Sequence, residues 1–537
     1  MTLPIPSIEY FLLCPMLIVF GVAVAGVLAE AFLPRRIRYG AQLALTLGGL
    51  AAAFIAVVVV ARSIPSSGRS AVLGAVAIDR PALFLQGTVL LVAILAVIFI
   101  AERSAERSFE AQRSAVGQAV EARVPAMAGA GLDSFAPQAS AVPGSAAERE
   151  AERAGAAQTE LFPLVLLSVG GMMVFPASND LLTMFVALEV LSLPLYLMCG
   201  LARHRRLLSQ EASMKYFLLG AFSSAFFLYG VALLYGATGT LALPGIRDAL
   251  AAHGVSSLAL VGVALLSVGL LFKVGAVPFH SWIPDVYQGA PTPITGFMAA
   301  ATKVAAFGAL LRVVYVALPP VHDQWRPVLW AIAILTMAVG TIAALNQTDV
   351  KRMLAYSSIA HVGFVLTGVI ADNPAGLSAT LFYLVAYSFS TIGAFAIVGL
   401  IRNADGSEDA NISHWAGLGR RSPIVGVLLS LFLLAFAGIP LTSGFVSKLV
   451  VFKAAAQGGA IPLVIIGVIA SGIAAYFYVR VIVSMFFTEP LGAVPRVVTP
   501  GILSVLAIAV CALVTLLLGI FPQPLLDLAD HAAKLLH

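Results

Sequence analysis

Residues 257–284 read SLALVGVALLSVGLLFKVGAVPFHSWIP, an apolar run that is interrupted near its end. A helix that crosses the hydrocarbon core of a bilayer needs about 20 mainly apolar residues. Lys273 lies inside this run, and Gly275, Pro278 and Pro284 follow it. Proline inside a spanning helix frees backbone groups that protein or water must satisfy again. The stretch therefore predicts a transmembrane helix that is broken just after a lysine.

The composition of the whole chain extends this interpretation. The 537 residues are 60% hydrophobic and 11% charged, and the mean hydropathy is +0.99. A soluble domain carries about 25% charged residues, and a soluble chain this apolar could not cover its surface with polar groups. The sequence thus predicts an all-α polytopic membrane protein in which nearly every residue lies in a spanning helix or a short connector.

Runs of spanning length recur, and we expect about fourteen transmembrane helices, the first of them retained rather than cleaved as a signal peptide. The predicted spans are 10–33, 40–61, 80–101, 160–177, 180–201, 211–236, 257–282, 292–317, 327–346, 350–370, 376–401, 423–455, 461–486 and 498–521. Helix 12 carries Gly438, Ile439, Pro440 and Gly444, so helices 7 and 12 are both predicted to be discontinuous. Breaks five helices apart predict two inverted five-helix repeats, helices 4–8 and 9–13.

These elements divide the chain into five expected parts. They are 1–101 with helices 1–3, the insertion 102–159, the first repeat 160–317, the second repeat 318–486, and 487–537 with helix 14 and the C-terminus. The insertion is rich in Ala, Glu, Arg, Ser and Gly without apolar periodicity, which indicates a cytoplasmic and partly disordered segment. A tolerated loop expansion and a functional role both remain open for it.

Basic residues in the loops orient the predicted helices. Alternate loops contain clusters of basic residues, namely Arg35, Arg36, Arg38, Arg203, Arg205, Arg206, Lys351, Arg352, Arg402, Arg420 and Arg421. The other loops carry scattered ones, such as Arg62, Arg69, Arg247 and Arg326. Because cytoplasmic loops carry an excess of Lys and Arg, we expect a multi-pass protein with both termini on the outer face.

Cysteines give no sign of a redox or metal centre. Cys14, Cys199 and Cys511 are scattered in apolar runs, without a CxxC or Cys/His cluster. The sequence has no Gly-rich phosphate loop or haem histidine pair. We therefore expect no cofactor and no metal in this chain.

Charged side chains inside the apolar runs are the candidate functional residues. A lysine at mid-membrane costs about 2.5–3.5 kcal/mol on insertion scales. Lys273 and Lys303 have no easy route to an interface, and Lys448 follows the break in helix 12. Lys215 lies about a turn from Glu211 near the cytoplasmic end, so snorkelling is an alternative for it.

A carboxylate and two histidines complete the set. Apolar residues flank Glu189 for two helical turns on each side, and its side chain is too short to reach the membrane surface by snorkelling. His361 lies ten residues beyond Lys351, about 15 Å along a helix, and so near the bilayer centre. His280 sits beside Pro278 in the broken segment. Each histidine could instead be a hydrogen-bonded core residue.

Together these groups form a series of titratable sites at mid-depth, as proton movement through a membrane requires. Three hypotheses follow: a proton-translocating subunit, a subunit of a cation/proton antiporter or membrane-bound hydrogenase, and a structural scaffold. A scaffold would not need four intramembrane lysines.

Four long motifs carry a family resemblance. EASMKYFLLGAFSS (211–224), KVGAVPFHSWIPDVY (273–287), GAPTP (289–293) and MLAYSSIAHVGF (353–364) resemble the antiporter-like membrane subunits of respiratory complex I, NADH–quinone oxidoreductase. The resemblance covers helices 1–14 except the insertion. The chain is most similar to the member that lacks a long C-terminal lateral helix and has lysine, here Lys448, rather than glutamate in helix 12.

The resemblance implies a function and a role for each residue. It implies a proton-translocating subunit driven by NADH:quinone electron transfer elsewhere, in which Glu189 pairs with Lys215, Lys273 and Lys303 form the central relay, and Lys448 is the terminal site. It places His280 and His361 along the connecting water path. FMN, iron–sulfur clusters and quinone would belong to partner subunits, the partners being other membrane subunits of the complex and the lipid bilayer. The expected location is the bacterial plasma membrane.

Overall fold

The structure, a computed structural model, describes residues 8–102, 135, 158–202, 205–403, 407–490 and 494–536. Most of the predicted insertion 102–159 and the loop residue Arg203 lie outside the described residues. The predictions made for them are therefore not addressed by the structure.

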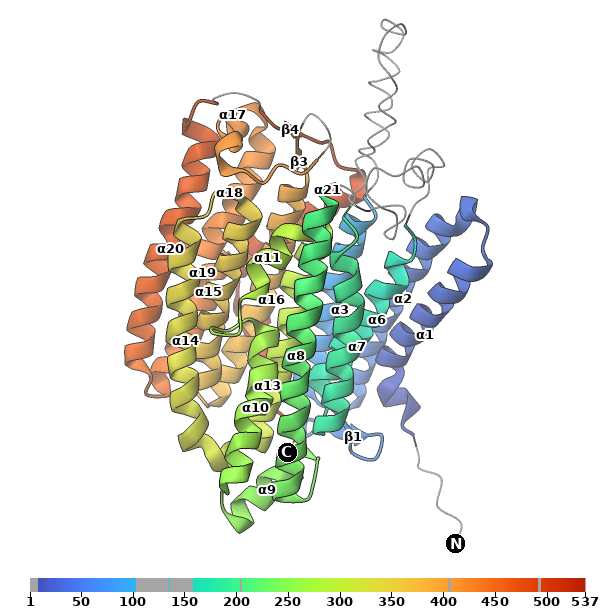
Figure 1. Ribbon diagram of the computed structural model, residues 1–537, viewed down its shortest axis with the longest axis vertical. Coiled ribbons are helices and arrows are strands. Elements are labelled where there is room, and N and C mark those ends of the chain that lie inside the picture. Colours follow the sequence, from blue (N-terminus) through green and yellow to red (C-terminus); the bar gives the residue numbers. More distant parts are fainter. Residues whose placement is uncertain are drawn as a thin grey trace, which may run out of the picture.

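The described residues form a bundle of long, roughly parallel helices (Figure 1). Twelve helices in this part of the chain are long and apolar enough to cross a membrane, and Leu161–Ala177 and Pro423–Ala437 are shorter apolar helices. Every predicted span coincides with one or two of these elements. The predicted all-α polytopic fold is thus confirmed.

The helix bounds follow in chain order. The first three spans are α1 (Tyr10–Phe32), α2 (Arg35–Ser63) and α3 (Arg80–Ile100). The next group contains α6 (Leu161–Val174), α7 (Leu181–Cys199), α8 (Arg206–Thr238), α9 (Leu243–His253), α10 (Ser257–Val274), α11 (Trp282–Gly289), α12 (Thr292–Phe297) and α13 (Lys303–Arg312). The last contains α14 (His322–Leu345), α15 (Val350–Ile370), α16 (Pro374–Gly399), α17 (Leu418–Arg421), α18 (Pro423–Ala437), α19 (Ser443–Gln457), α20 (Ile461–Phe487), α21 (Ile502–Ile520) and α22 (Gln523–Ala532).

Both predicted breaks have the same backbone geometry. Gly275 ends α10 with φ +86°, and Gly438 ends α18 with φ +82°. In each case the glycine N–H and the next N–H donate to one carbonyl, that of Leu271 or Leu434. This is a Schellman cap. It needs one residue in the left-handed conformation, and glycine adopts that conformation at low cost because it has no Cβ. The caps leave the final carbonyls of each half-helix free in the interior.

The helix that carries Lys303 departs from regular α geometry. A π-helical turn at Met298–Thr302 separates α12 from α13, and a second, Val313–Ala317, follows Arg312. Such turns occur often at functional sites. This span, α15 and α16 are almost wholly buried, whereas α1, α2, α8, α20 and α21 expose many apolar side chains. The candidate residues Lys303 and His361 therefore lie on the central helices.

Some elements differ from the sequence prediction. Helix 7 does not end near residue 282, because α11 continues it to Gly289; Pro284 lies in the first turn of α11, where proline is tolerated. The amphipathic helices α9 and α22 are too short and polar to have been recognised as spans. Two antiparallel pairs were also not predicted, β1 (Arg69–Ala71) with β2 (Val76–Ile78), and β3 (Ile401–Arg402) with β4 (Arg496–Val497).

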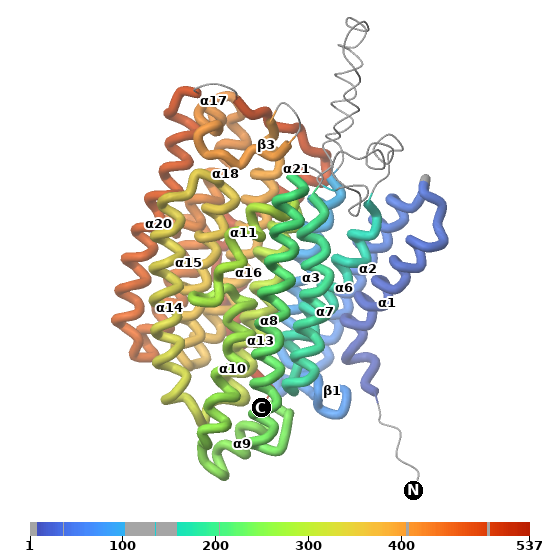
Figure 2. The backbone as a smooth tube through the Cα atoms, in the orientation of Figure 1, coloured from blue at the N-terminus to red at the C-terminus, as the bar shows by residue number. Residues whose placement is uncertain are grey.

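Three of the loop arginines mark one end of the bundle. In Figure 2 the beginning of α1, the hairpin at β1, α9 and the C-terminus lie at one end, and α17 and β3 lie at the other. Arg402, Arg420 and Arg421 lie at the α17–β3 end, which we call the basic end. This arrangement agrees with the even number of crossings expected from the sequence.

A buried ion pair fastens the bundle near its other end. Arg312 Nη2 lies 2.8 and 2.9 Å from the two oxygens of Asp79, and both side chains are buried. Arg312 Nε also donates to Pro176 O, and Asp79 caps α3 by accepting from Ala82 N. The pair thus joins α3, α13 and the turn that follows α6.

Breaking this pair should destabilise the protein strongly. Asp79→Asn or Arg312→Met should lower the free energy of unfolding by about 3–5 kcal/mol, because each leaves a buried charge unpaired. Thermal unfolding in detergent measures the effect, with the exposed substitution Asp248→Asn as control. The double variant should recover part of the loss; two additive losses would contradict the pairing.

Candidate functional site

Lys273 is held in a cage of hydroxyl groups and aromatic rings. It lies in the last turn of α10, and its Nζ donates to Ser192 Oγ of α7 at 2.7 Å and to Tyr216 Oη of α8 at 3.2 Å. The same Nζ lies 5.7 and 5.2 Å from the ring centres of Tyr196 and Tyr216. These contacts offset part of the cost of burying an ammonium group.

Glu189 lies one turn before Ser192 on α7, within electrostatic range of Lys273. Its Oε1 is buried and has no hydrogen-bond partner among the described residues. A buried carboxylate oxygen without a partner is costly, so a hydrogen-bond donor that reached Glu189 would stabilise it.

Lys215 is directed away from Glu189, toward the basic end. Its Nζ lies 2.6 Å from Glu211 on the same helix and 2.9 Å from Asp285 on α11. The expected Glu189–Lys215 pair is therefore not formed in this structure. The physical reason is that long side chains on a helix point back toward its N-terminus, which for α8 is the basic end.

Lys303 links the first broken helix, α10, to α15. From the first turn of α13, its Nζ donates to Val274 O at 3.5 Å and to Ser358 O at 3.0 Å. Val274 is the last residue of the broken helix α10, and Ser358 lies one turn before His361 on α15. The free carbonyl end of the first broken helix thus accepts from a lysine, as the negative end of a helix dipole favours.

His361 lies in a group of tyrosines between Lys303 and Lys448. Its Nδ1 is 2.7 Å from Tyr383 Oη, and its Nε2 is 3.4 Å from Tyr478 Oη. Tyr387, whose ring lies 6.0 Å from Lys303 Nζ, contacts the His361 ring. These hydroxyl and imidazole groups both donate and accept protons.

Lys448 repeats the arrangement at the second break. Its Nζ donates to Phe436 O and Ala437 O, both at 2.9 Å, and to Ser471 Oγ at 2.8 Å. Those carbonyls are the last two of the broken helix α18, and the Phe436 ring contacts His361. Lys448 corresponds in this respect to Lys303, which caps α10, rather than to Lys273, which lies before its break.

The candidate residues therefore form a series across the middle of the bundle. Lys273, Lys303, His361 and Lys448 are 3–5% exposed. His280 lies in the turn between α10 and α11, and its buried Nδ1 has no hydrogen-bond partner among the described residues. Four buried basic groups joined through hydroxyls and freed carbonyls can store and exchange protons.

Comparison with known proteins shows the family. Residues 178–474 match the family model described as NADH:quinone oxidoreductase/Mrp antiporter, TM. The chain is 80% identical to NADH-quinone oxidoreductase subunit N of Mycobacterium tuberculosis, with 100% of both chains covered, and 66% identical to that of Rhodococcus opacus, with 99% and 97% covered. The chain belongs to the subunit N family of NADH-quinone oxidoreductase.

Two solved structures have the same fold as this chain. A chain of respiratory complex I from Thermus thermophilus is 32% identical, with 96% of this chain and 99% of that chain covered and a TM-score of 0.73. A chain of the Mrp complex from Dietzia sp. DQ12-45-1b is 22% identical, with 97% of both covered and a TM-score of 0.77, and shows the same fold. The predicted family is thus confirmed, and this chain is an antiporter-like membrane subunit of a multisubunit complex.

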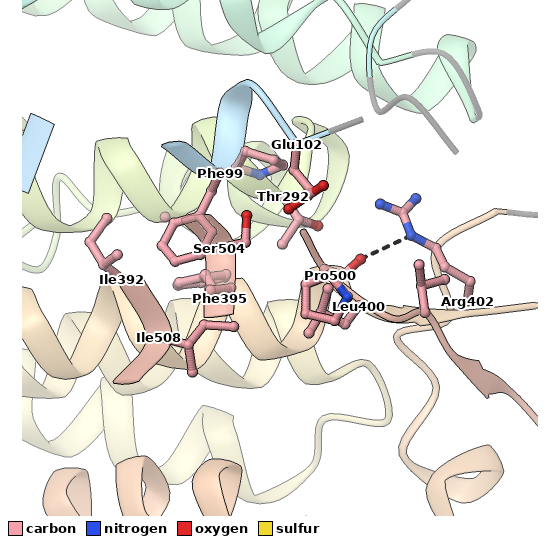
Figure 3. A pocket seen from close by; sticks show the side chains of 15 residues that line it. Phe99, Glu102, Thr292, Ile392, Phe395, Leu400, Arg402, Pro500, Ser504 and Ile508 are labelled. Atoms are coloured by element: carbon pink, nitrogen blue, oxygen red, sulfur yellow. Dashed lines mark hydrogen bonds between the residues drawn. The ribbon is translucent and has the colours of Figure 1, made fainter. Parts of the chain in front are cut away.

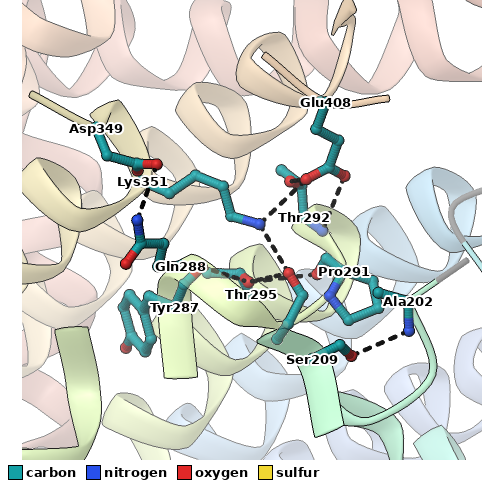
Figure 4. A network of polar contacts seen from close by, with 12 residues as sticks. Ala202, Ser209, Tyr287, Gln288, Pro291, Thr292, Thr295, Asp349, Lys351 and Glu408 are labelled. Carbon is teal, nitrogen blue, oxygen red and sulfur yellow. Dashed lines mark hydrogen bonds and ion pairs between the residues drawn. The ribbon is translucent and has the colours of Figure 1, made fainter. Parts of the chain in front are cut away.

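A second polar network, which the sequence did not indicate, lies at the basic end of the chain, and Figure 4 shows its residues. Lys351 Nζ is 3.1 Å from Glu408 Oε2 and donates to Ala290 O at 2.7 Å. Glu408 also accepts from Thr292 Oγ1 and N, at the N-terminus of α12. Glu408 lies in a loop, outside the apolar runs in which charged residues attract attention, so the sequence did not single it out. Lys351 was considered only as one of the basic residues that orient the helices.

The charges around Glu408 keep its carboxyl ionised. Burial would raise the pKa of Glu408, but the charges on Lys351 and Arg402 and the hydrogen bonds from Thr292 and Lys351 lower the pKa to about 2. The pair thus fixes the start of the helix that leads to Lys303 and the start of α15, which leads to His361.

Two small cavities adjoin this network. One, of about 20 Å³, is lined by Gln288, Lys351 and Glu408 among others, and has room for a water molecule. The other, of about 60 Å³, lies between α3, α12, α16 and α21, with Glu102, Thr292, Arg402 and Ser504 at its wall (Figure 3). Thr292 borders the second cavity and also binds Glu408, and Arg402 lines both cavities, so the two spaces adjoin the same network.

The described residues contain no group of three or more His, Cys, Asp or Glu side chains that could hold a metal ion. Cys14, Cys199 and Cys511 are free thiols.

Removing the Glu408 charge should destabilise the chain without adding a titration near neutral pH. Glu408→Gln should cost about 3–5 kcal/mol, since Lys351 stays buried without its partner. A free glutamate titrates at about 4.3, and in the folded chain the pKa is lower. The stabilisation by the ionised Glu408 is therefore complete above the free pKa of about 4.3 and is lost as the pH falls toward 2.

Unfolding temperatures of wild type and Glu408→Gln between pH 6 and 8 test this, with Asp248→Asn as the exposed control. The difference between the two proteins should be constant over that range. A difference that vanishes toward pH 6 would contradict the low pKa.

Proposed function

We propose that this chain translocates protons as a membrane subunit of respiratory complex I. Electron transfer from NADH to quinone would take place in other subunits and drive the movement. The observation that carries the proposal is the series of buried basic groups, Lys273, Lys303, His361 and Lys448, whose charges are solvated by hydroxyls and by the free carbonyls of two broken helices.

Glu189 and Lys215 would control the charge on Lys273. When Lys215 pairs with Glu189, the carboxylate is neutralised and Lys273 loses an attractive charge, so Lys273 releases its proton toward Lys303. When Lys215 leaves, the carboxylate draws a proton back onto Lys273. The conformation described above, with Glu189 unpaired, corresponds to the second state.

The electrostatic energy of one ion pair is large enough to move one proton across the membrane. Moving one charge across a membrane costs about 2.3 kcal/mol per 100 mV. Two unit charges about 4 Å apart at an effective dielectric of about 20 interact by about 4 kcal/mol. Rearranging one such pair can therefore offset the work of moving one proton against a potential of that size.

This chain would work as one membrane subunit among several. FMN, iron–sulfur clusters and quinone would be held by other subunits, and this chain would contact further membrane subunits in the bacterial plasma membrane. The alternative, a cation/proton antiporter or hydrogenase subunit, is supported by likeness of fold, whereas the full-length relatives above are complex I subunits. The insertion would lie on the cytoplasmic side.

Removing the ammonium of Lys273 should stop proton translocation while the complex still assembles. Lys273→Ala should lower NADH-driven proton uptake in reconstituted vesicles by on the order of tenfold or more. Glu189→Gln should act in the same direction. Lys273→Arg should not restore uptake, because arginine stays protonated. Wild-type uptake per electron in an assembled Lys273→Ala complex would reduce this residue to a structural role.

Topology provides an independent check. We propose that the basic end faces the cytoplasm and that both termini face outward. Ser66→Cys, in the loop after α2, should react with a membrane-impermeant maleimide in right-side-out vesicles. Ser413→Cys, at the basic end, should react after permeabilisation. The unsubstituted chain, whose cysteines are partly or fully buried, gives the background; the reverse labelling pattern would refute this orientation.

A further inference from the structure

We propose that Asp285 is a second seat for the Lys215 ammonium, so that Lys215 alternates between an inner carboxylate, Glu189, and an outer one, Asp285. The inference rests on the proposed function of the relay and assigns a positioning role to Asp285. It identifies where Lys215 goes when it leaves Glu189.

The geometry of the outer seat is complete in this structure. Lys215 Nζ lies 2.9 Å from Asp285 Oδ2, while Arg352 Nη1 of α15 binds the other oxygen, Oδ1, at 2.7 Å. Each carboxylate oxygen of Asp285 thus has its own cation. When Lys215 leaves, Arg352 still neutralises Asp285, and Glu211, which also loses its ion pair, is exposed to solvent.

The inner seat is empty in the same conformation. Glu189 Oε1 is buried and accepts no hydrogen bond from the described residues. The contacts Ser213 Oγ to Tyr196 O and Ser209 Oγ to Cys199 O fix how the antiparallel helices α7 and α8 lie against each other. They place Lys215 beside residues 193–194, about 6–7.5 Å along the helix from Glu189. A flexible four-carbon side chain can cover this offset by changing rotamer.

The two seats differ in solvation, and the difference favours exchange. The side chains of Lys215 and Asp285 are 42% and 31% exposed, and that of Glu211, the other outer partner, is 56% exposed. Exposed ion pairs contribute little because water competes for both charges. Lys215 therefore leaves the outer seat at small cost, whereas the inner seat offers a buried carboxylate oxygen that has no hydrogen-bond partner among the described residues.

The outer seat is also connected to the rest of the relay. Asp285 lies on α11, the second half of the broken helix that carries Lys273. Arg352 lies on α15, the helix of His361, and donates to Gln288 at the end of α11 at 3.1 Å. Binding or release of Lys215 thus changes the charge balance at a junction of both halves of the series.

The test uses the intact complex with Asp285→Asn, which keeps the shape and removes the charge. The matched control is Asp349→Asn: Asp349 belongs to the same network through Gln288, does not contact Lys215, and as Asn still caps α15. Electron cryo-microscopy locates Lys215 Nζ. In Asp285→Asn the ratio of inner to outer occupancy should rise about fivefold, as expected on losing one exposed ion pair. NADH-driven turnover should fall, and Asp285→Glu should restore both.

Glu211→Gln provides a second variant that does not threaten folding, since Glu211 is exposed. It removes one outer carboxylate and should shift Lys215 in the same direction by a smaller factor. The proposal is overturned if Lys215 keeps its wild-type position in either variant, or if Asp349→Asn moves it equally. These outcomes are independent of the relay: the position of Lys215 is measured directly, whereas wild-type uptake in Lys273→Ala would remove the proposed function and leave the two seats intact.

Discussion

An ammonium group inside a bilayer must be solvated by the protein that carries it. In this chain two broken helices provide that solvation. Gly275 and Gly438 end their half-helices with the same cap, and the carbonyls left free accept from Lys303 and Lys448. The same arrangement therefore occurs twice. A glycine ends the half-helix, its final carbonyls carry the negative end of the helix dipole, and a buried lysine donates to them. Lys273 and His361 are held by hydroxyls beside these two sites.

Rigid packing is needed to keep such groups in place. The Arg312–Asp79 pair fastens the helices at one end of the bundle, and the Lys351–Glu408 pair fastens α12 and α15 at the basic end. The cluster at Lys215 is different, because its side chains are partly exposed and one of its possible partners, Glu189, is unsatisfied. In the proposed mechanism, buried ion pairs at the two ends of the bundle hold the helices in place, and the partly exposed Lys215 is the charge that moves.

The sequence allowed much of this to be predicted, for physical reasons. Apolar runs of bilayer length have few alternatives to a spanning helix, and a glycine and prolines after Lys273 mark a break. The partners of the charges could not be predicted in the same way. Asp285 stands in a quoted motif, yet its contact with Lys215 depends on how α8 and α11 pack. Glu408 lies in a loop, and Asp79 pairs with a residue 233 positions away.

The measurement that tests the central claim most directly is the number of protons translocated per electron when Lys303 is replaced. Lys303 donates to both Val274 O and Ser358 O and so joins the two halves of the series. Lys453, an exposed lysine on α19, is the matched control. An assembled complex with Lys303→Met should translocate fewer protons per electron than wild type, while Lys453→Met should be unchanged. An undiminished ratio in Lys303→Met would contradict the account.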